Sequence, residues 1–237
     1  MHGSTSPAAD TLLKQVPFFT KLNPEEAAAL AERLIPRRFS PGQVIFHLGD
    51  PGGLLYIIIR GKVKISHSTP DGQEALLAIL GSGDFFGELA LLDESPRSAT
   101  AEAIEPTDPL TLHREEFLRF LTHNPSFVTH VLQTLAKRIR NLNDQISDIF
   151  FLDLNGRLAR TLLNLAAQHG KPVKDGILID ISLTQTDLAE MTGATRVSIN
   201  KTLGRFRRAK WVRSEGRRFI ILNQKALRNL IQISGGA

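Results

Sequence analysis

The spacing of apolar residues divides the 237-residue chain into segments of different expected structure. Residues 10–37 follow a helical pattern, with Asn23 as a capping residue and Pro24 in the first turn of its second part. From 38 to about 112, apolar runs alternate with glycine- and proline-containing turns, as in a small β-barrel or jelly roll. The expected strand runs are QVIFHLG, LLYIIIRGKVKISH, EALLAIL and ATAEAI. The intervening turns contain glycines that are expected to serve backbone geometry: Gly42, Gly49, Gly61, Gly72 and Gly83.

Residues 114–151 return to a helical pattern that contains a narrower periodicity. Its apolar residues are spaced alternately four and three apart: Val128, Leu132, Leu135, Ile139, Leu142, Ile146 and Ile149. This heptad seam predicts a two-stranded coiled coil and hence a homodimer, with an ordinary core helix as the alternative. The seam ends at FFLDLNGR, where we predict a break at Asn155–Gly156 before the helix RLARTLLNLAAQH.

The segment TQTDLAEMTGATRVSINKTLGRF fits a helix-turn-helix. Ala189 is small where two helices would cross, Gly193 suits the tight turn, and Ile199 and Leu203 form a narrow buried stripe on the second helix. The surface left for phosphates and base edges comprises Thr195, Arg196, Val197, Ser198, Asn200, Lys201 and Arg205, with Thr184 and Thr186 at the start of the first helix.

The following segment, KWVRSEGRRFIILN, has two apolar runs around Glu215–Gly216 and predicts a hairpin with Arg217 and Arg218 near its tip. Charge supports a nucleic-acid partner here, because residues 151–237 hold 15 Lys+Arg and 6 Asp+Glu, a net of +9, whereas residues 1–150 have a net of −4. We therefore predict a winged helix-turn-helix that binds double-stranded DNA. The alternative is a helical hairpin used only for packing.

Composition excludes several other classes of protein. The chain has no cysteine, which excludes disulfides, thiolate metal sites and cysteine-held iron–sulfur clusters. Its seven histidines are scattered and no nucleophile, phosphate-loop or zinc-protease motif is present, so we expect neither an enzyme nor a metal site. A haem held by histidine alone is a remaining alternative. No apolar run reaches the ~18–20 residues of a membrane helix, and MHGSTSPAAD lacks the features of a secretion signal, so we expect a cytoplasmic protein with no membrane partner.

The stretch GDFFGELALLDESPRSATA places Gly87, Glu88, Arg97 and Ser98 in an otherwise apolar and glycine-rich segment. No histidine or cysteine lies in it, so we expect it to hold an anion rather than to react. The alternative is that Arg97 and Glu88 form a buried salt bridge without a ligand.

The order of these parts resembles the cyclic-AMP receptor protein and FNR family of bacterial transcription regulators, over roughly residues 12–225. The resemblance is carried by GDFFGELALLDESPRSATA, FFLDLNGRLARTLLNLA and LAEMTGATRVSINKTLGRF. It implies an α+β fold: N-terminal helices and a cyclic-nucleotide-binding β-barrel (jelly roll) in 1–123, a long dimerisation helix in 124–151, and a C-terminal winged helix-turn-helix in 152–237. The implied protein is a dimeric regulator that recognises a palindromic DNA site and contacts RNA polymerase.

The resemblance assigns the anion to a cyclic nucleotide, and we expect cyclic AMP as an effector. Arg97 and Ser98 are expected at the phosphate, Glu88 at the ribose 2′-hydroxyl, and Gly87 where the backbone approaches closely. The family's adenine-reading threonine–serine pair corresponds to Leu142 and Asn143 here, of which only Asn143 can contact the adenine amino group. A ligand that touches both barrel and dimer helix is expected to favour one orientation of the DNA-binding domains. The alternative is a regulator that binds DNA without any effector and is controlled by its abundance.

The resemblance also implies how DNA is read. Arg196 matches an arginine that contacts guanine, and Lys201 stands where a second arginine is usual. Val197 replaces a glutamate and is expected to contact a thymine methyl group, so the preferred palindrome should differ from the family's at that position.

Overall fold

The computed structural model describes residues 24–234, so the first predicted helix, TLLKQVPFF, and the capping role of Asn23 lie outside the described residues. The chain divides into two compact units between Lys137 and Arg138. Within the described range no helix has the length and apolar character needed to cross a membrane.

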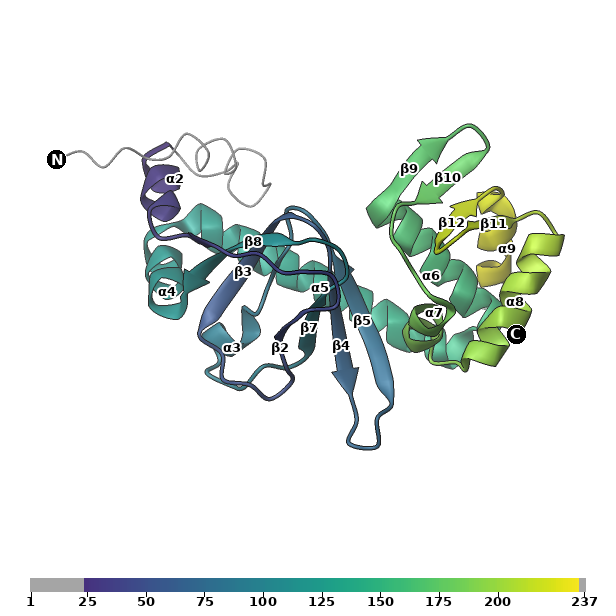
Figure 1. The fold of residues 1–237 in the computed structure, drawn as a ribbon, viewed down its shortest axis with the longest axis horizontal. Coiled ribbons are helices and arrows are strands. Elements are labelled where there is room, and N and C mark those ends of the chain that lie inside the picture. Colours follow the sequence, from purple (N-terminus) through teal and green to yellow (C-terminus); the bar gives the residue numbers. More distant parts are fainter. Residues whose placement is uncertain (1–23, 235–237) are drawn as a thin grey trace. The chain divides into compact units, whose positions relative to one another are not determined.

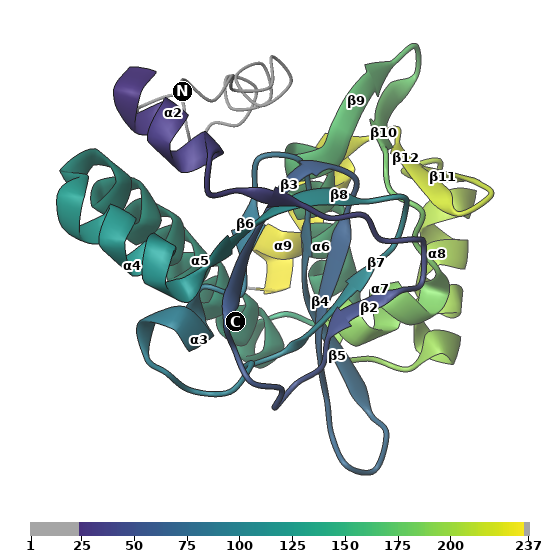
Figure 2. The same ribbon diagram turned by 60° about the vertical axis from the view of Figure 1, so that its left-hand side comes forward.

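The first unit contains two four-stranded antiparallel sheets that enclose an apolar interior (Figures 1 and 2). The first sheet has the order β1-β8-β3-β6, formed by β1 (Ile35–Pro36), β8 (Asp108–His113), β3 (Leu54–Arg60) and β6 (Phe85–Phe86). The second has the order β2-β7-β4-β5, formed by β2 (Val44–Phe46), β7 (Thr100–Ala103), β4 (Val63–Ser68) and β5 (Glu74–Leu80). Each predicted strand run therefore contains a strand or two, whereas β1, β6 and β8 were not predicted.

Three short helices accompany these strands: α2 (Pro24–Ala31), α3 (Leu89–Leu92) and α4 (Arg114–His123). Pro24 begins α2 as predicted, but the helical prediction to residue 37 is wrong. The helix does not continue to residue 37, because Pro36 disfavours the helical conformation of Ile35, the residue before it. Ile35 and Pro36 instead pair with Thr111 and Leu110 of β8.

The turn glycines have the backbone role that the sequence predicted. All of the predicted turn glycines have positive φ: Gly42, Gly49, Gly61, Gly72 and Gly83. At Gly61 space is also limiting, because a Cβ there would lie 2.5 Å from Thr107 Cα. This close approach fixes the chain between β3 and β4 against the loop before β8.

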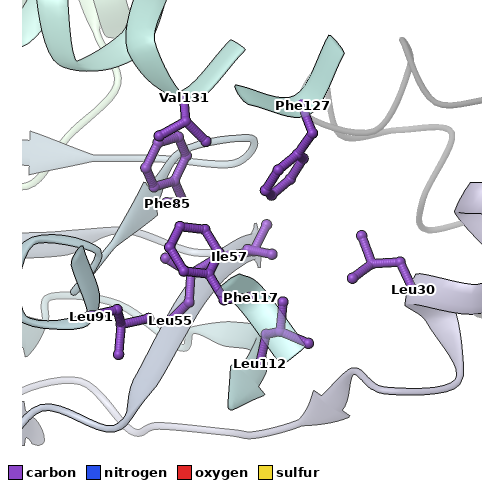
Figure 3. Close-up of a cluster of buried hydrophobic side chains, with 9 residues drawn as sticks. All are labelled: Leu30, Leu55, Ile57, Phe85, Leu91, Leu112, Phe117, Phe127 and Val131. Carbon is purple, nitrogen blue, oxygen red and sulfur yellow. The ribbon is translucent and has the colours of Figure 1, made fainter. Parts of the chain in front are cut away.

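A second apolar cluster joins the first sheet to the helices (Figure 3). Its fully or nearly buried members are Leu30, Leu55, Ile57, Phe85, Leu91, Leu112, Phe117, Phe127 and Val131. Phe127 packs edge-to-face against Phe117 and Phe120, with ring centroids 6.0 and 5.0 Å apart. The first turns of the long helix are thereby held on the outside of the barrel.

The predicted helical stretch 114–151 is divided at Asn124 into α4 and the long α5 (Pro125–Phe151). Only Phe127 and Val131 of α5 are buried. Five seam residues remain largely exposed in the single chain: Leu132 (60%), Ile139 (58%), Leu142 (45%), Ile146 (53%) and Ile149 (61%). Of the remaining seam residues, Leu135 packs against the cluster in Figure 3, so the exposed part of the seam consists of these five side chains.

The second unit holds, after the end of α5, helices α6 (Leu154–His169), α7 (Gln185–Thr192), α8 (Arg196–Arg208) and α9 (Gln224–Ser234). A four-stranded antiparallel sheet of order β11-β12-β10-β9 accompanies them: β11 (Val212–Glu215), β12 (Arg218–Ile221), β10 (Gly176–Ile179) and β9 (Gly170–Val173). The hairpin β11–β12 was predicted, whereas β9, β10 and α9 were not.

The predicted break at Asn155–Gly156 is wrong, because both residues lie in the first turn of α6. The chain breaks just before, at Asp153, whose carboxylate accepts the Gly156 backbone N–H at 2.8 Å and caps the helix. Gly156 is buried, and a Cβ there would lie 3.2 Å from Leu152 Cβ. Its small size therefore serves packing at the helix start.

Candidate functional site

Arg97 is the buried cation of the barrel unit, with only 4% of its surface exposed. Its backbone is fixed by the turn that follows β2: the Arg97 N–H donates to the Asp50 carbonyl at 2.8 Å, and the Gly49 N–H donates to the Arg97 carbonyl at 2.9 Å. Both the backbone N–H and the backbone carbonyl of Arg97 are therefore hydrogen-bonded, which fixes the point from which its side chain enters the barrel.

The guanidinium of Arg97 donates to two backbone carbonyls, Nη1 to Gly87 at 2.7 Å and Nη2 to Leu54 at 2.8 Å. Its Nε is buried and has no hydrogen-bond partner among the described residues. Buried donors rarely lack a hydrogen-bond partner, so the Nε–H is available for an acceptor that enters the site. Gly87 has φ +82°, and a Cβ there would lie 2.5 Å from Arg97 Nη1, so only glycine fits beside the guanidinium.

Arg97 remains a cation in spite of its burial, because the guanidinium group is not deprotonated in proteins. Desolvation lowers the pKa of Arg97 from its usual value, and the carboxylates of Glu88 and Asp50 oppose that shift. Glu88 is itself 3% exposed at the start of α3. The hydrogen bonds described for the guanidinium go to carbonyls rather than to the Glu88 carboxylate. The salt bridge considered as the ligand-free alternative is therefore not what anchors Arg97.

The other predicted ligand residues are placed differently. Ser98 is exposed while Arg97 is buried, as expected for neighbours in an extended segment. Asn143 is exposed on α5 and belongs to the second unit, so its contact with an adenine remains a prediction. In the described portion of the chain, no group of His, Asp or Glu side chains is arranged to hold a metal ion.

Sequence reasoning missed the aromatic side chains around the guanidinium. Arg97 Cζ lies 4.2 Å from the ring centroid of Phe46 and 5.8 Å from that of Tyr56. Both rings belong to the interior cluster of the barrel. Phe46 could not be selected from the sequence because a register irregularity in β2, described below, decides which way it points.

In the second unit, α7 and α8 are joined by a tight turn at Gly193. Gly193 ends α7 in the left-handed conformation, with φ 61° and ψ 46°. Thr184 and Asp187 form a capping box at the start of α7. Thr195 caps α8 by accepting the Ser198 N–H at 3.2 Å. The two helices therefore begin and end where the helix-turn-helix pattern predicted.

Comparison with known protein families identifies two domains, one in the barrel unit and one that contains the helix-turn-helix. Residues 36–124 match the cyclic nucleotide-binding domain family, and residues 156–230 match the Crp-like helix-turn-helix domain family. The chain is 36% identical over 218 residues to the CRP-like cAMP-activated global transcriptional regulator of Mycobacterium tuberculosis, covering 92% of this chain and 97% of that protein. The chain belongs to the CRP/FNR family of transcription regulators.

Other proteins similar to this chain are named for different effectors or roles. The global nitrogen regulator of Synechococcus elongatus is 33% identical, covering 80% of this chain and 86% of that protein. The c-di-GMP responsive regulator CLP of Xanthomonas campestris shares the fold, with a TM-score of 0.72, 23% identity, and coverage of 84% of this chain and 99% of that one. The α+β fold and a regulatory rather than enzymatic role are thus shown, while family membership alone leaves the effector open.

The CRP/FNR helix-turn-helix exposes most of the predicted DNA-contacting residues. Those that are exposed are Thr186, Thr195, Arg196, Val197, Asn200, Lys201, Arg205 and Arg217, whereas Thr184 and Ser198 are half-buried. The buried face of α8 consists of Ile199 and Leu203, as predicted, together with Thr202 and Phe206. Two hydroxyls are already engaged, since Thr184 donates to Asp187 Oδ2 at 2.8 Å and Thr195 donates to Ser198 Oγ at 2.9 Å. Contacts of these two hydroxyls with DNA phosphates stay predictions, and each would replace the hydrogen bond that the hydroxyl now donates.

The wing is a tight hairpin in which Glu215 pairs with Arg218, so its turn residues are Gly216 and Arg217 rather than Glu215 and Gly216. Gly216 has φ +60°, which explains the displacement by one residue. The Arg217 carbonyl accepts the Leu183 N–H at 2.7 Å. This bond ties the wing to the segment that leads into α7.

Arg157 is a further residue that the sequence did not single out. Its Nη1 donates to the Leu152 carbonyl at 2.9 Å and its Nε donates to the Thr192 carbonyl at 3.0 Å. It therefore joins the break between α5 and α6 to the end of α7. Only the folded arrangement brings these two carbonyls together, so no local sequence signal could have shown it.

Two glycines of this domain, Gly193 and Gly204, provide a matched test of its turn. Gly193→Ala should lower the free energy of unfolding by about 1–2 kcal/mol, because a Cβ is unfavourable in the left-handed conformation. Gly204→Ala should raise it by about 0.5–1 kcal/mol, because Gly204 lies inside α8 and its Cβ would meet nothing closer than Arg208 Nη1 at 3.8 Å. Chemical denaturation of both variants measures the difference. Equal changes in the free energy of unfolding of both variants would contradict the left-handed turn assigned to Gly193.

Proposed function

We propose that the protein is a homodimeric regulator whose binding to a palindromic DNA site responds to a cyclic nucleotide, with cyclic AMP as the effector. The observation that carries the proposal is Arg97, a buried guanidinium whose Nε–H has no partner among the described residues. A cyclic nucleotide supplies a singly charged phosphate, and arginine forms strong charge-assisted hydrogen bonds with phosphate oxygens.

The neighbours of Arg97 support a nucleotide over a simple anion. Glu88 is a buried carboxylate that is close enough to Arg97 to raise its pKa electrostatically. A ribose 2′-hydroxyl is a donor that a carboxylate accepts. We propose that Arg97 and Ser98 bind the phosphate, that Glu88 binds the ribose, and that Asn143 contacts the adenine.

The exposed seam of α5 supports the proposed homodimer. Apolar side chains at heptad spacing that remain about half exposed are unusual on a protein surface and mark an interaction face. A second copy of the same helix presents the matching seam. Two recognition helices related by a two-fold axis would then read half-sites about one DNA turn, roughly 34 Å, apart. We further propose that the DNA-bound dimer contacts RNA polymerase, as the family resemblance implies, and that it acts in the cytoplasm.

One observation favours a second candidate, a regulator that needs no effector. Arg97 already has two carbonyl partners and an aromatic ring beside it, so the guanidinium is partly satisfied without a ligand. In that case the barrel would be a structural and dimerising unit, and abundance would control DNA occupancy.

Calorimetric titration of the full-length protein with cyclic AMP separates these candidates. The proposal predicts saturable binding of one cyclic AMP per chain, and cyclic GMP in a parallel titration measures how far the base is selected. Absence of binding for both nucleotides would favour the effector-independent regulator.

Arg196→Ala tests the DNA-reading assignment. If Arg196 donates two hydrogen bonds to guanine, its loss should weaken binding to the preferred palindrome by about 1–3 kcal/mol and relax the choice of base at that position. Binding is measured by selection from a randomised palindrome and by titration at fixed salt. Lys225→Ala, an exposed cation at the start of α9 outside the predicted interface, is the matched control. Uniform weakening over all sequences would show that Arg196 contacts only phosphate.

A further inference from the structure

Phe46 lies against the guanidinium of Arg97, which keeps one donor, its Nε–H, without a partner among the described residues. A ring below a guanidinium interacts with its face, whereas its N–H groups point outward in the plane. The Phe46 centroid lies 4.2 Å from Arg97 Cζ, within the distance of a cation–π contact. Two in-plane donors bind the Gly87 and Leu54 carbonyls, and the buried Nε–H stays unpartnered. The ring and an incoming acceptor therefore do not compete for the same part of Arg97.

An irregularity in β2 aims Phe46 into the barrel. Val44 pairs with Glu102 and Phe46 pairs with Ala101, so two steps along β2 correspond to one along β7. Neighbouring residues of a regular strand point to opposite faces, but here both Ile45 and Phe46 pack on the interior cluster. The bulged strand thus adds a ring to the barrel interior that a regular strand would turn outward.

The same backbone fixes the ring relative to the arginine. The turn directly after Phe46 makes the two hydrogen bonds with the Arg97 backbone, through Gly49 and Asp50. Phe46 is further supported by Tyr56 and Phe86, whose ring centroids lie 5.7 and 5.8 Å from its own. Ring and guanidinium are therefore placed by one local unit of structure.

We propose that Phe46 is a positioning residue for effector binding: its ring holds the guanidinium plane of Arg97 so that the free edge, with the Nε–H, receives the phosphate. This inference rests on the proposed function. The ring fixes the orientation of the arginine before the ligand arrives, which reduces the side-chain entropy lost on binding. It also stabilises the cation where water is excluded.

Fluorinated phenylalanines at position 46 test the proposal in the full-length protein. One, two or three ring fluorines weaken the attraction for a cation in steps while changing the volume of the ring little. We expect the dissociation constant for cyclic AMP to rise stepwise, by about tenfold for the trifluorinated ring, if the lost attraction is comparable to that of a buried cation–π pair. The melting temperature of the ligand-free protein should change far less. The same series at Phe117, which packs on Phe127 at 6.0 Å in the other apolar cluster, is the matched control and should leave the dissociation constant unchanged.

Three results would overturn the inference or its foundation in distinguishable ways. A flat series at Phe46 in a protein that binds cyclic AMP overturns the positioning role and leaves the proposed function intact. Equal effects at Phe46 and Phe117 assign the change to packing and also overturn it. If the unmodified protein binds neither cyclic AMP nor cyclic GMP, the proposed function fails. In that case NMR measurement of the rotation of the Arg97 guanidinium about its Nε–Cζ bond tests the positioning role. The positioning role requires this rotation to be faster in Phe46→Leu than in the unmodified protein.

Discussion

Arg97→Gln weakens the binding of cyclic AMP by about two orders of magnitude or more. The guanidinium is the cation placed to bind the phosphate, and its charge-assisted hydrogen bonds are worth about 1.5–3 kcal/mol each, where 1.4 kcal/mol corresponds to a factor of ten. The substitution also leaves the Gly87 and Leu54 carbonyls short of a donor, so the free energy of unfolding should fall by about 1–3 kcal/mol. Calorimetry measures the affinity and chemical denaturation measures the stability.

Arg114→Gln separates these two effects. Arg114 also donates from Nε to a barrel carbonyl, that of Leu91 at 3.0 Å, but it takes no part in the proposed ligand site. It should lower stability while preserving the affinity for cyclic AMP. If Arg97→Gln remains folded and binds cyclic AMP as tightly as the unmodified protein, Arg97 is not the phosphate ligand.

Ile139→Glu with Ile146→Glu converts the protein to a monomer and abolishes tight binding to the palindrome. Both side chains lie in the exposed seam, so a dimer would bury four isoleucines that the double substitution replaces with charges. Burying an isoleucine contributes about 1.5–3 kcal/mol, so the dimer dissociation constant should rise by more than about 10⁴-fold. Sedimentation equilibrium measures the association, and anisotropy measures DNA binding.

Asn141→Glu is the control for this experiment, because Asn141 is exposed on α5 but lies outside the heptad seam. It should leave the protein dimeric. The unfolding of the barrel should be unaffected by the seam substitutions, since the α5 side chains buried against it are Phe127 and Val131. A doubly substituted protein that remains a dimer would show that the seam is not the interface.

Local signals made much of the fold predictable. The run EALLAIL coincides with β5, and the turn glycines have the positive φ that their positions required. Gly193 was identified from its spacing to Ala189, and it ends α7 in the left-handed conformation. In these places the conformation depends on the identity of one residue or on a short periodic pattern, both of which can be read from the sequence.

Other features depend on contacts between distant segments and could not be predicted in this way. Arg97 was predicted to bind an anion, but its carbonyl partners at Gly87 and Leu54, which come from separate strands or loops, were not. Phe46 reaches the guanidinium only because β2 is irregular. The break near α6 was displaced because the cap at Asp153 and the packing of Gly156 on Leu152 outweigh the usual preference of glycine for helix ends.

The most direct test of the central claim is the affinity of the full-length protein for a palindromic DNA, measured by fluorescence anisotropy at one stated salt concentration with and without saturating cyclic AMP. The salt must be fixed because phosphate contacts make such affinities steeply salt-dependent. Effector control predicts that cyclic AMP tightens DNA binding by about tenfold or more, in the range of typical coupling between sites. Equal and tight DNA binding in both conditions would contradict it and identify a regulator that acts without an effector.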